Sequence, residues 1–221
     1  NFSTEIIINA SAGGATSVFV ADIDGDNDLD VFSSAGSNQV VEWYENDGTG
    51  NFGPGQVISD SCLFAAFVFV ADLNNDTYPD VLTASAGNDR ICWYENDGEE
   101  NFTGHIITTL TNGARCVIAV DIDGDNDLDV ASASEWDNKI AWYENDGAGN
   151  FDAEQIVTTN ALEAITVFAA DLDGDEDMDL LSASEADDKI AWYQNDGSGN
   201  FSSEEIISSI ADGARCVYAY D

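Results

Sequence analysis

The residues with the clearest chemistry are aspartates at alternate positions of a nine-residue segment, residues 22–30. In a tightly wound loop, carboxylates at positions 1, 3, 5 and 9 and a backbone carbonyl at position 7 can converge into an oxygen cage for a hard cation. Calcium suits such a cage better than magnesium, which dehydrates reluctantly and takes few protein ligands. Without a cation, five carboxylates in nine residues would repel one another. The motif therefore predicts Ca²⁺ as the cofactor.

The motif recurs almost intact in residues 121–129 and 171–179, and a divergent copy occupies residues 72–80. The divergent copy keeps an oxygen atom at each ligating position, so we expect it to bind calcium more weakly than the other three. The predicted metal ligands are Asp22, Asp24, Asp26, Asp28 and Asp30; Asp72, Asn74, Asp76, Tyr78 and Asp80; Asp121, Asp123, Asp125, Asp127 and Asp129; and Asp171, Asp173, Asp175, Asp177 and Asp179.

Positions 4 and 6 of the loop carry residues that suit sharp turns. Gly25 relieves crowding at position 4, and Asn27 and Asn126 at position 6 tolerate the left-handed backbone conformation. Thr77 and Glu176 stand at position 6 in the other two copies and are less suited to it. The residue types thus support a tightly wound loop.

Three sequence markers recur in one register with a period of about 50 residues. The first aspartate of the motif falls at 22, 72, 121, 171 and 221, Asn-Phe at 1, 51, 101, 150 and 200, and Trp-Tyr-Glu/Gln-Asn-Asp-Gly begins at 43, 93, 142 and 192. The sequence predicts a single repeat array over residues 1–221, with units at about 1–50, 51–100, 101–149 and 150–199 and a partial unit at 200–221.

Each unit reads as four short strands. The first (17–21, 67–71, 116–120 and 166–170) is apolar on both faces, which predicts burial on both sides. The second follows the acidic motif (30–34 and 80–85), the third carries the Trp-Tyr pair and ends at Asn-Asp-Gly, and the fourth follows Asn-Phe (5–9 and 205–209). With no helical periodicity, this predicts an all-β protein with propeller-type blades of four antiparallel strands. A β-solenoid is the alternative.

Composition narrows the possible partners. The chain has 44 Asp and Glu against 5 Lys and Arg, a formal charge of −39, which disfavours nucleic acid and anionic bilayers as partners. The longest apolar run, residues 62–71, is too short for the roughly 20 residues of a membrane-spanning helix. We therefore expect neither nucleic-acid binding nor membrane insertion.

Indirect signals favour an extracellular location. Asn-x-Ser/Thr sequons begin at Asn1, Asn9, Asn75, Asn101 and Asn200, as in a secreted glycoprotein, although chance explains some of them in a chain rich in Asn and Ser. The first residues show neither the charged start nor the apolar stretch of a signal peptide. The sequence reads as a mature product or an excised piece.

The search for catalytic residues is negative. The only histidine, His105, stands where other units carry surface polar residues, so no Ser-His-Asp or Cys-His constellation can be built from repeated positions. The four cysteines have no metal-binding spacing and read as small buried residues, with a Cys62–Cys92 disulfide as the alternative. The repeated Trp and Tyr residues predict packing between blades, whereas Trp136, which occurs in one unit only, predicts an exposed contact residue. We expect no enzymatic activity.

The chain resembles the FG-GAP or VCBS repeats of integrin α-subunit propellers and other secreted proteins. The resemblance rests on the Asp-x-Asp-Gly-Asp-x-x-x-Asp segment of residues 22–30 and its copies, the apolar strand before each, and Gly-Asn-Phe at 50–52, 149–151 and 199–201. It implies calcium in the loop between the first two strands of a blade, and a role in adhesion, ligand binding or scaffolding. The Gly-Ala-Pro of integrins is replaced by Ser-Ala-Gly or Ser-Ala-Ser, and no integrin ligand-binding surface is matched.

These observations favour an extracellular calcium-binding repeat protein with a structural, adhesive or self-assembling role. The expected partners are calcium and either another copy or another extracellular protein or glycan. Residues 200–221 repeat the content of residues 1–22, so the half-units belong to a longer array or are completed by other copies in a ring or filament. The alternative is a non-catalytic carbohydrate- or protein-recognition propeller attached to a larger secreted enzyme.

Overall fold

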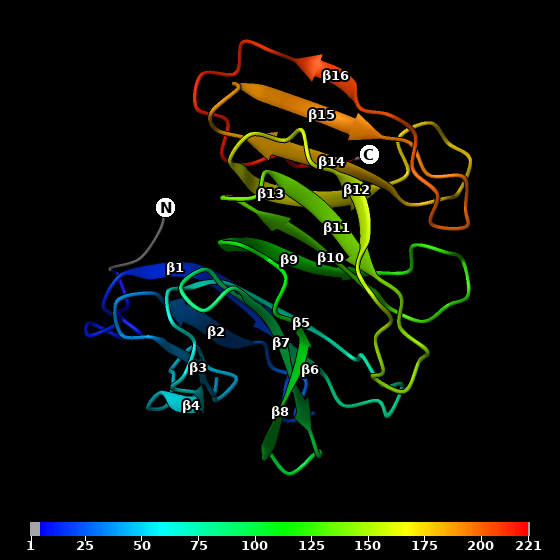
Figure 1. The fold of residues 1–221 in the computed structure, drawn as a ribbon. Helices are drawn as coiled ribbons and strands as arrows, with labels where there is room; N and C mark the ends of the chain where they lie inside the picture. The colour runs from blue at the N-terminus through cyan, green and yellow to red at the C-terminus, as the bar shows by residue number, and fades with distance from the viewer. Residues whose placement is uncertain (1–4, 221) are drawn as a thin grey trace.

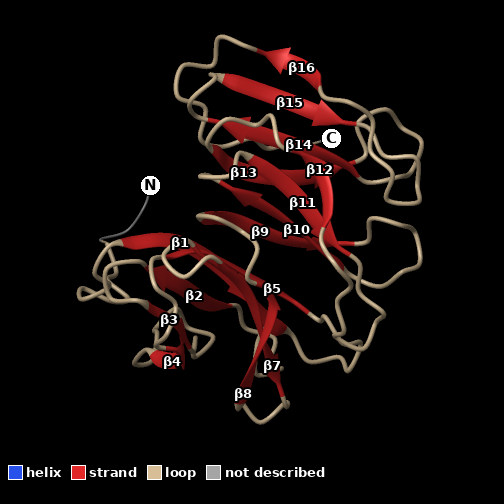
Figure 2. Cartoon of the chain, in the orientation of Figure 1, coloured by secondary structure: helices blue, strands red, loops and turns tan. Residues whose placement is uncertain are grey.

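The computed structural model describes residues 5–220 and contains four antiparallel sheets of four strands each (Figures 1 and 2). Within each sheet the strands follow sequence order. The described residues form no helix, and hence none that could cross a membrane. The strands are β1 (Ala15–Ala21), β2 (Asp30–Ala35), β3 (Val40–Tyr44) and β4 (Gln56–Ser59); β5 (Ala65–Ala71), β6 (Asp80–Ser85), β7 (Arg90–Asn96) and β8 (Phe102–Thr108); β9 (Ala114–Val120), β10 (Asp129–Ser134), β11 (Lys139–Tyr143) and β12 (Gln155–Thr158); and β13 (Ala164–Ala170), β14 (Asp179–Ser184), β15 (Lys189–Tyr193) and β16 (Glu205–Ser208).

The pairing of the first two strands closes each acidic loop at its base. In the first sheet, Ala21 at the end of β1 lies opposite Asp30 at the start of β2. The last aspartate of the motif holds the same place in the other three sheets. The strand register therefore fixes where each loop begins and ends.

Each sheet straddles the border between two sequence units. The first sheet takes β1, β2 and β3 from residues before the Asn-Phe marker at 51, and β4 from residues after it. An isolated bridge between Asn46 and Phe52 closes the intervening turn. The fourth strand predicted at 205–209 is present as β16, but the one predicted at 5–9 is wrong. A fourth strand pairs with the third strand of its sheet, and no third strand of the described residues pairs with residues 5–9.

Successive sheets pack face to face through three apolar clusters, with β1, β5, β9 and β13 adjacent in that order. Each cluster combines a tryptophan of one sheet with a valine and a tyrosine of the next, as predicted for residues that pack between blades. The central members are Trp43 with Val68 and Tyr94, Trp93 with Val117 and Tyr143, and Trp142 with Val167 and Tyr193.

The prediction that every first strand is buried on both sides is wrong for β1. Val18 and Val20 of β1 are 67% and 51% exposed, whereas the corresponding Val68, Val117 and Val167 are buried. In the other three sheets this face packs against the preceding sheet, whereas no sheet of the described residues packs on this face of β1. The apolar pattern of β1 is the same as that of β5, β9 and β13, so its greater exposure results from the lack of a neighbouring sheet among the described residues.

The four cysteines are free. Cys62 and Cys116 are buried as predicted, Cys92 is half-buried and Cys216 is exposed. The Cys62 sulfur lies 3.2 Å from the Tyr94 hydroxyl, so the alternative of a Cys62–Cys92 disulfide is not realised.

Candidate metal centres

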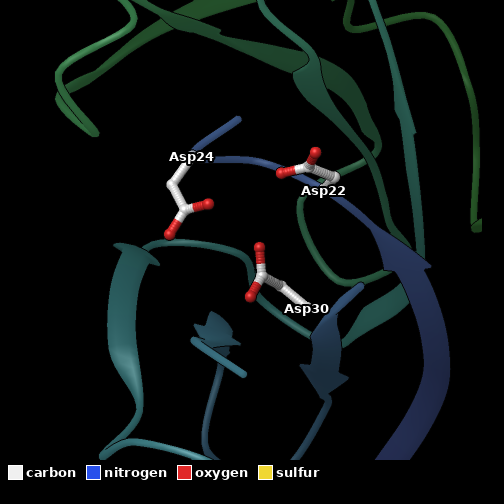
Figure 3. Close-up of side chains that lie close together, drawn as sticks. All are labelled: Asp22, Asp24 and Asp30. Carbon is white, nitrogen blue, oxygen red and sulfur yellow. The ribbon is translucent and has the colours of Figure 1, made fainter. Parts of the chain in front are cut away.

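Three of the four acidic loops bring three carboxylates together. In the first loop the side chains of Asp22, Asp24 and Asp30 converge, and one oxygen from each lies within 4.8 Å of the others (Figure 3). The corresponding residues of two other loops converge in the same way: Asp121, Asp123 and Asp129, and Asp171, Asp173 and Asp179. Positions 1, 3 and 9 of the motif therefore meet at one point in three sheets.

Backbone amides wind the loop around its first aspartate. Asp22 accepts hydrogen bonds from the N–H of Gly25 at 2.8 Å and from the N–H of Asn27 at 2.9 Å. Both donors adopt positive φ, 79° and 73°; the left-handed conformation was predicted for position 6. Thr77 and Glu176 at position 6 adopt the same conformation, with φ of 78° and 75°, although it is unfavourable for their side chains. The winding is thus common to all four loops.

The last aspartate of each loop is fully buried. Asp30 accepts the N–H of Ile23 at 3.1 Å on one oxygen and the N–H of Asn46 at 2.8 Å on the other. Burial is the largest influence on this carboxyl and raises its pKa, while the two amide donors act in the opposite direction. Burial likewise raises the pKa of Asp80 and of Asp129 to about 7. Burial thus disfavours the ionised form of Asp30, Asp80 and Asp129, which a neighbouring cation would stabilise.

Positions 5 and 7 lie outside the convergent trio. Asp26 at position 5 accepts the N–H of Asp28 at 2.8 Å and so helps to shape the loop. The position 7 side chain lies against the glycine of the Asn-Asp-Gly turn, where a Cβ atom on Gly48 would overlap the Asp28 carboxylate. The same contact joins Tyr78 to Gly98, Asp127 to Gly147 and Asp177 to Gly197. The assignment of positions 5 and 7 as metal ligands stays a prediction for Asp26, Asp28, Asp76, Tyr78, Asp125, Asp127, Asp175 and Asp177.

The second loop keeps the winding but not the trio of carboxylates. Asp72 accepts the N–H of Thr77 at 2.8 Å, and the buried Asp80 accepts the N–H of Leu73 at 3.0 Å. At position 3, the amide of Asn74 donates to Asp76 at 3.0 Å. One carboxylate is therefore replaced by a neutral amide whose NH₂ group is already bonded to a neighbour.

The donor set of the loops fits a calcium ion. All converging atoms are carboxylate oxygens, the ligands that hard cations prefer, and amides hold them from behind. Desolvation and the neighbouring Asp22 and Asp26 raise the pKa of Asp24, so the assembled loop is electrostatically unfavourable without a cation. Residues at positions 1, 3 and 9 could hold the ion, and the ion would remove their mutual repulsion.

One group of residues, which the sequence pattern indicates only as turn formers, also contacts the acidic loops. These are the first asparagines of the four Asn-Asp-Gly turns: Asn46, Asn96, Asn145 and Asn195. Their main-chain N–H groups donate to the last aspartate of each loop. Their recurrence at one position in every unit is the sequence signal that could indicate this role.

His105 and Trp136 lie apart from the acidic loops, whereas the sequon residue Asn75 lies in the second loop. His105 stacks on Trp93 with ring centroids 4.7 Å apart, and its Nε2 lies 3.0 Å from Glu95. Trp136 is 56% exposed, as predicted. Four sequon asparagines have side-chain amide nitrogens that are hydrogen-bonded within the chain: Asn9, Asn75, Asn101 and Asn200. The sequon asparagine Asn1 and the predicted motif residue Asp221 lie outside the described residues.

Comparison with protein families identifies the repeat. A model of the FG-GAP-like repeat matches residues 22–83, 72–132, 121–182 and 171–221. The chain therefore belongs to the FG-GAP-like repeat family, and the predicted resemblance is confirmed. A search of curated proteins gave no match.

Solved structures of similar fold come from proteins of different kinds. A lectin from Agrocybe aegerita that recognises non-reducing terminal N-acetylglucosamine is 19% identical, with a TM-score of 0.62 over 87% of this chain and 52% of the lectin. The V. cholerae biofilm matrix protein Bap1 is 21% identical, with a TM-score of 0.51 over 82% of this chain and 27% of Bap1. Virginiamycin B lyase from Staphylococcus aureus is 13% identical, with a TM-score of 0.59 over 94% of this chain and 60% of the lyase.

These similarities establish the fold. The chain spans about half of the lectin and a smaller part of Bap1, with 52% and 27% of their lengths covered. Since one of the three is a lyase, the fold by itself does not separate catalytic from non-catalytic proteins.

Proposed function

We propose that this chain is an extracellular calcium-binding propeller module with a structural or adhesive role and no catalytic activity of its own. The observation that carries the proposal is the convergence of the same three aspartates at the same place in three sheets. The formal charge of −39 supports a role for a bound cation and a soluble, repulsive surface.

Calcium would act by stabilising the blades. Each loop joins the first two strands of a sheet, so a cation held by positions 1, 3 and 9 ties the two strand ends together. At ten times its dissociation constant a bound ion contributes about 1.4 kcal/mol per site, so three sites contribute about 4 kcal/mol. That is a large part of the roughly 5–15 kcal/mol by which folded domains are stable.

Calcium titration of the chelator-stripped protein tests this proposal. We expect three sites to fill first, a fourth to fill at higher calcium, and the melting temperature to rise by about 10 °C. Magnesium at the same concentration is the control for ionic strength, and Asp24→Asn, Asp123→Asn and Asp173→Asn together should remove most of the response. Equal melting temperatures in calcium and in EDTA would contradict the proposal.

Self-association is the form of structural role that one surface supports. The exposed face of β1, with Val18 and Val20, corresponds to the face that the preceding sheet covers in the other three blades. A second copy that presents a sheet face could cover it in the same way. Native mass measurement of the wild type and of Val18→Lys tests this, because charge on this face should abolish any assembly.

Recognition of a glycan or protein is the second candidate, and the exposure of Trp136 favours it. Trp136 lies in the turn between β10 and β11, and its ring packs over Gly113, where a Cβ atom would overlap it. A rigid exposed indole is suited to stacking on a sugar ring. Glycan-array binding that is lost in Trp136→Ala and kept in the exposed-residue control Ile106→Ala would support recognition; absence of binding would leave the structural role.

A further inference from the structure

The asparagines of the Asn-Asp-Gly turns do more than form turns. Asn96, Asn145 and Asn195 are 0%, 1% and 2% exposed, although they stand at the start of a surface turn. Each uses both its main chain and its side chain as donors. Their partners belong to two different acidic loops.

The main chain of each asparagine binds the loop of its own sheet. The N–H of Asn195 donates to Oδ1 of Asp179 at 2.9 Å, and its side-chain amide donates to the carbonyl of Met178 at 3.1 Å. Asp179 and Met178 are positions 9 and 8 of the fourth loop. Asn195 therefore holds the last carboxylate of that loop.

The side chain of the same residue reaches the loop of the preceding sheet. The Asn195 amide also donates to the carbonyl of Ile122 at 2.6 Å. Ile122 lies between Asp121 and Asp123, the first two carboxylates of the third loop. Because both side-chain partners are carbonyl oxygens, the NH₂ group must face them.

Ile122 is also hydrogen-bonded to the last aspartate of its own loop. The N–H of Ile122 donates to Oδ2 of Asp129 at 3.0 Å. A continuous path of buried hydrogen bonds thus runs from Asp129 through Ile122 and Asn195 to Asp179. The path joins two carboxylate trios that are 50 residues apart in sequence.

The same path continues through the other loops. Asn145 joins the third loop to the second through the Leu73 carbonyl at 2.8 Å, and Asn96 joins the second to the first through the Ile23 carbonyl at 3.3 Å. Leu73 donates to Asp80 as Ile122 does to Asp129. The divergent second loop therefore keeps the hydrogen bonds that link it to its neighbours, although it lacks one carboxylate of the trio.

We infer that Asn96, Asn145 and Asn195 are positioning residues that couple calcium binding in successive loops. The inference rests on the proposed calcium-binding function. An ion in the fourth loop fixes Asp179, which fixes Asn195, and Asn195 holds the peptide between the first two ligands of the third loop. By linkage, an ion in the third loop favours binding in the fourth by the same factor.

A titration with a reporter in each of three loops tests the coupling. Gly25, Gly124 and Gly174 each donate their N–H to the first aspartate of their own loop, at 2.8, 2.8 and 2.7 Å. Their amide signals in ¹H–¹⁵N NMR spectra of the full chain, followed against calcium, give a separate midpoint for the first, third and fourth loops.

Removal of the Asn195 side chain should weaken two loops. In Asn195→Ala, loss of one buried hydrogen bond to each loop should raise the Gly124 and Gly174 midpoints about fivefold and leave that of Gly25 unchanged. Asn46→Ala is the matched control, because the Asn46 amide donates to Leu29 of its own loop and no described loop precedes it. It should raise the Gly25 midpoint alone.

A second variant tests the coupling without touching the buried network. Asp171→Asn replaces an exposed ligand of the fourth loop, so it should remove the Gly174 response and raise the Gly124 midpoint about fivefold. Asp152→Asn, which removes an exposed carboxylate outside the loops, should leave both midpoints unchanged.

The outcomes separate the coupling from calcium binding itself. If Asn195→Ala raises only the Gly174 midpoint and Asp171→Asn leaves that of Gly124 unchanged, the loops bind independently and the coupling is overturned. If none of the three wild-type glycine signals responds to millimolar calcium, the proposed function fails and the coupling with it. A shift of Gly124 in both variants establishes the coupling.

Discussion

The main-chain N–H of Asn145 donates a 2.9 Å hydrogen bond to Oδ1 of Asp129, a carboxylate with no exposed surface. The other oxygen of Asp129 accepts the N–H of Ile122 at 3.0 Å. Asp129 is therefore held by the backbone of two separate segments. The ninth position of the motif has a structural role in addition to its role as a candidate ligand.

This dual role predicts that Asp129→Asn destabilises the protein even without calcium. The introduced NH₂ group would face a backbone N–H and leave a buried donor unpaired, at a cost of about 2–3 kcal/mol. Asp125→Asn is the matched control, because Asp125 is exposed and an asparagine at this position can still accept the N–H of Asp127. Urea unfolding of both variants in EDTA measures the difference, and equal stabilities would show that Asp129 matters only as a ligand.

The repeat and the loops could be predicted from sequence because each depends on local residues. The 50-residue period, the strand pattern and the turn residues at positions 4 and 6 can be read from the residues of each unit, and the structure confirms the left-handed conformation of Asn27 at position 6. The roles of position 7 and of the turn asparagines could not be predicted in this way. Asp28 lies against Gly48 and Asn195 bonds to Ile122, and both contacts depend on how distant segments pack.

The exposure of β1 shows a second limit of the sequence pattern. Val18 and Val68 stand at the same place in their units, yet one is 67% exposed and the other fully buried. Hydrophobic periodicity indicates which face of a strand requires a partner. Whether the partner is present depends on the neighbouring sheet.

The left-handed conformation at position 6 predicts a stabilising substitution. Glu176 adopts a φ of 75°, which costs a residue with a long side chain about 1 kcal/mol and asparagine less. Glu176→Asn should therefore raise the unfolding free energy by about 0.5–1 kcal/mol. Glu176→Ala removes the same negative charge without this conformational benefit, so a similar gain in the alanine variant would attribute the effect to charge.

The Asn-Asp-Gly turns predict a pH-dependent contribution to stability. The side chain of Asn150, followed by backbone amides, lowers the pKa of Asp146 through hydrogen bonds to its carboxylate. A lowered pKa in the folded state means that the ionised form contributes stability above the unfolded-state pKa of about 4, and that this contribution is lost as the pH falls through the folded-state value.

Asn150→Ala should accordingly destabilise the protein at pH 7 and lose this effect in acid. Unfolding of the wild type and variant in EDTA between pH 7 and the lowest pH at which both fold measures the difference. Working in EDTA removes calcium binding as a second source of pH dependence. A difference that stays constant down to pH 3 would show that Asn150 acts by packing and not through the ionised Asp146.

The second loop predicts a gain of calcium affinity from one substitution. At position 3 the Asn74 amide donates to Asp76, where the other loops carry a converging carboxylate. Asn74→Asp would complete the trio with Asp72 and Asp80, and an added carboxylate ligand should tighten calcium binding in this loop by about tenfold. The same change adds repulsion when no ion is bound, so the variant should melt at a lower temperature than the wild type in EDTA and at a higher one in calcium.

The amide of Thr77, which donates to Asp72 at 2.8 Å, reports calcium binding to this loop in an NMR titration. Asn74→Ala removes the amide without adding charge and should show the opposite change in affinity; an unchanged Thr77 midpoint in Asn74→Asp would mean that position 3 is not a ligand in this loop.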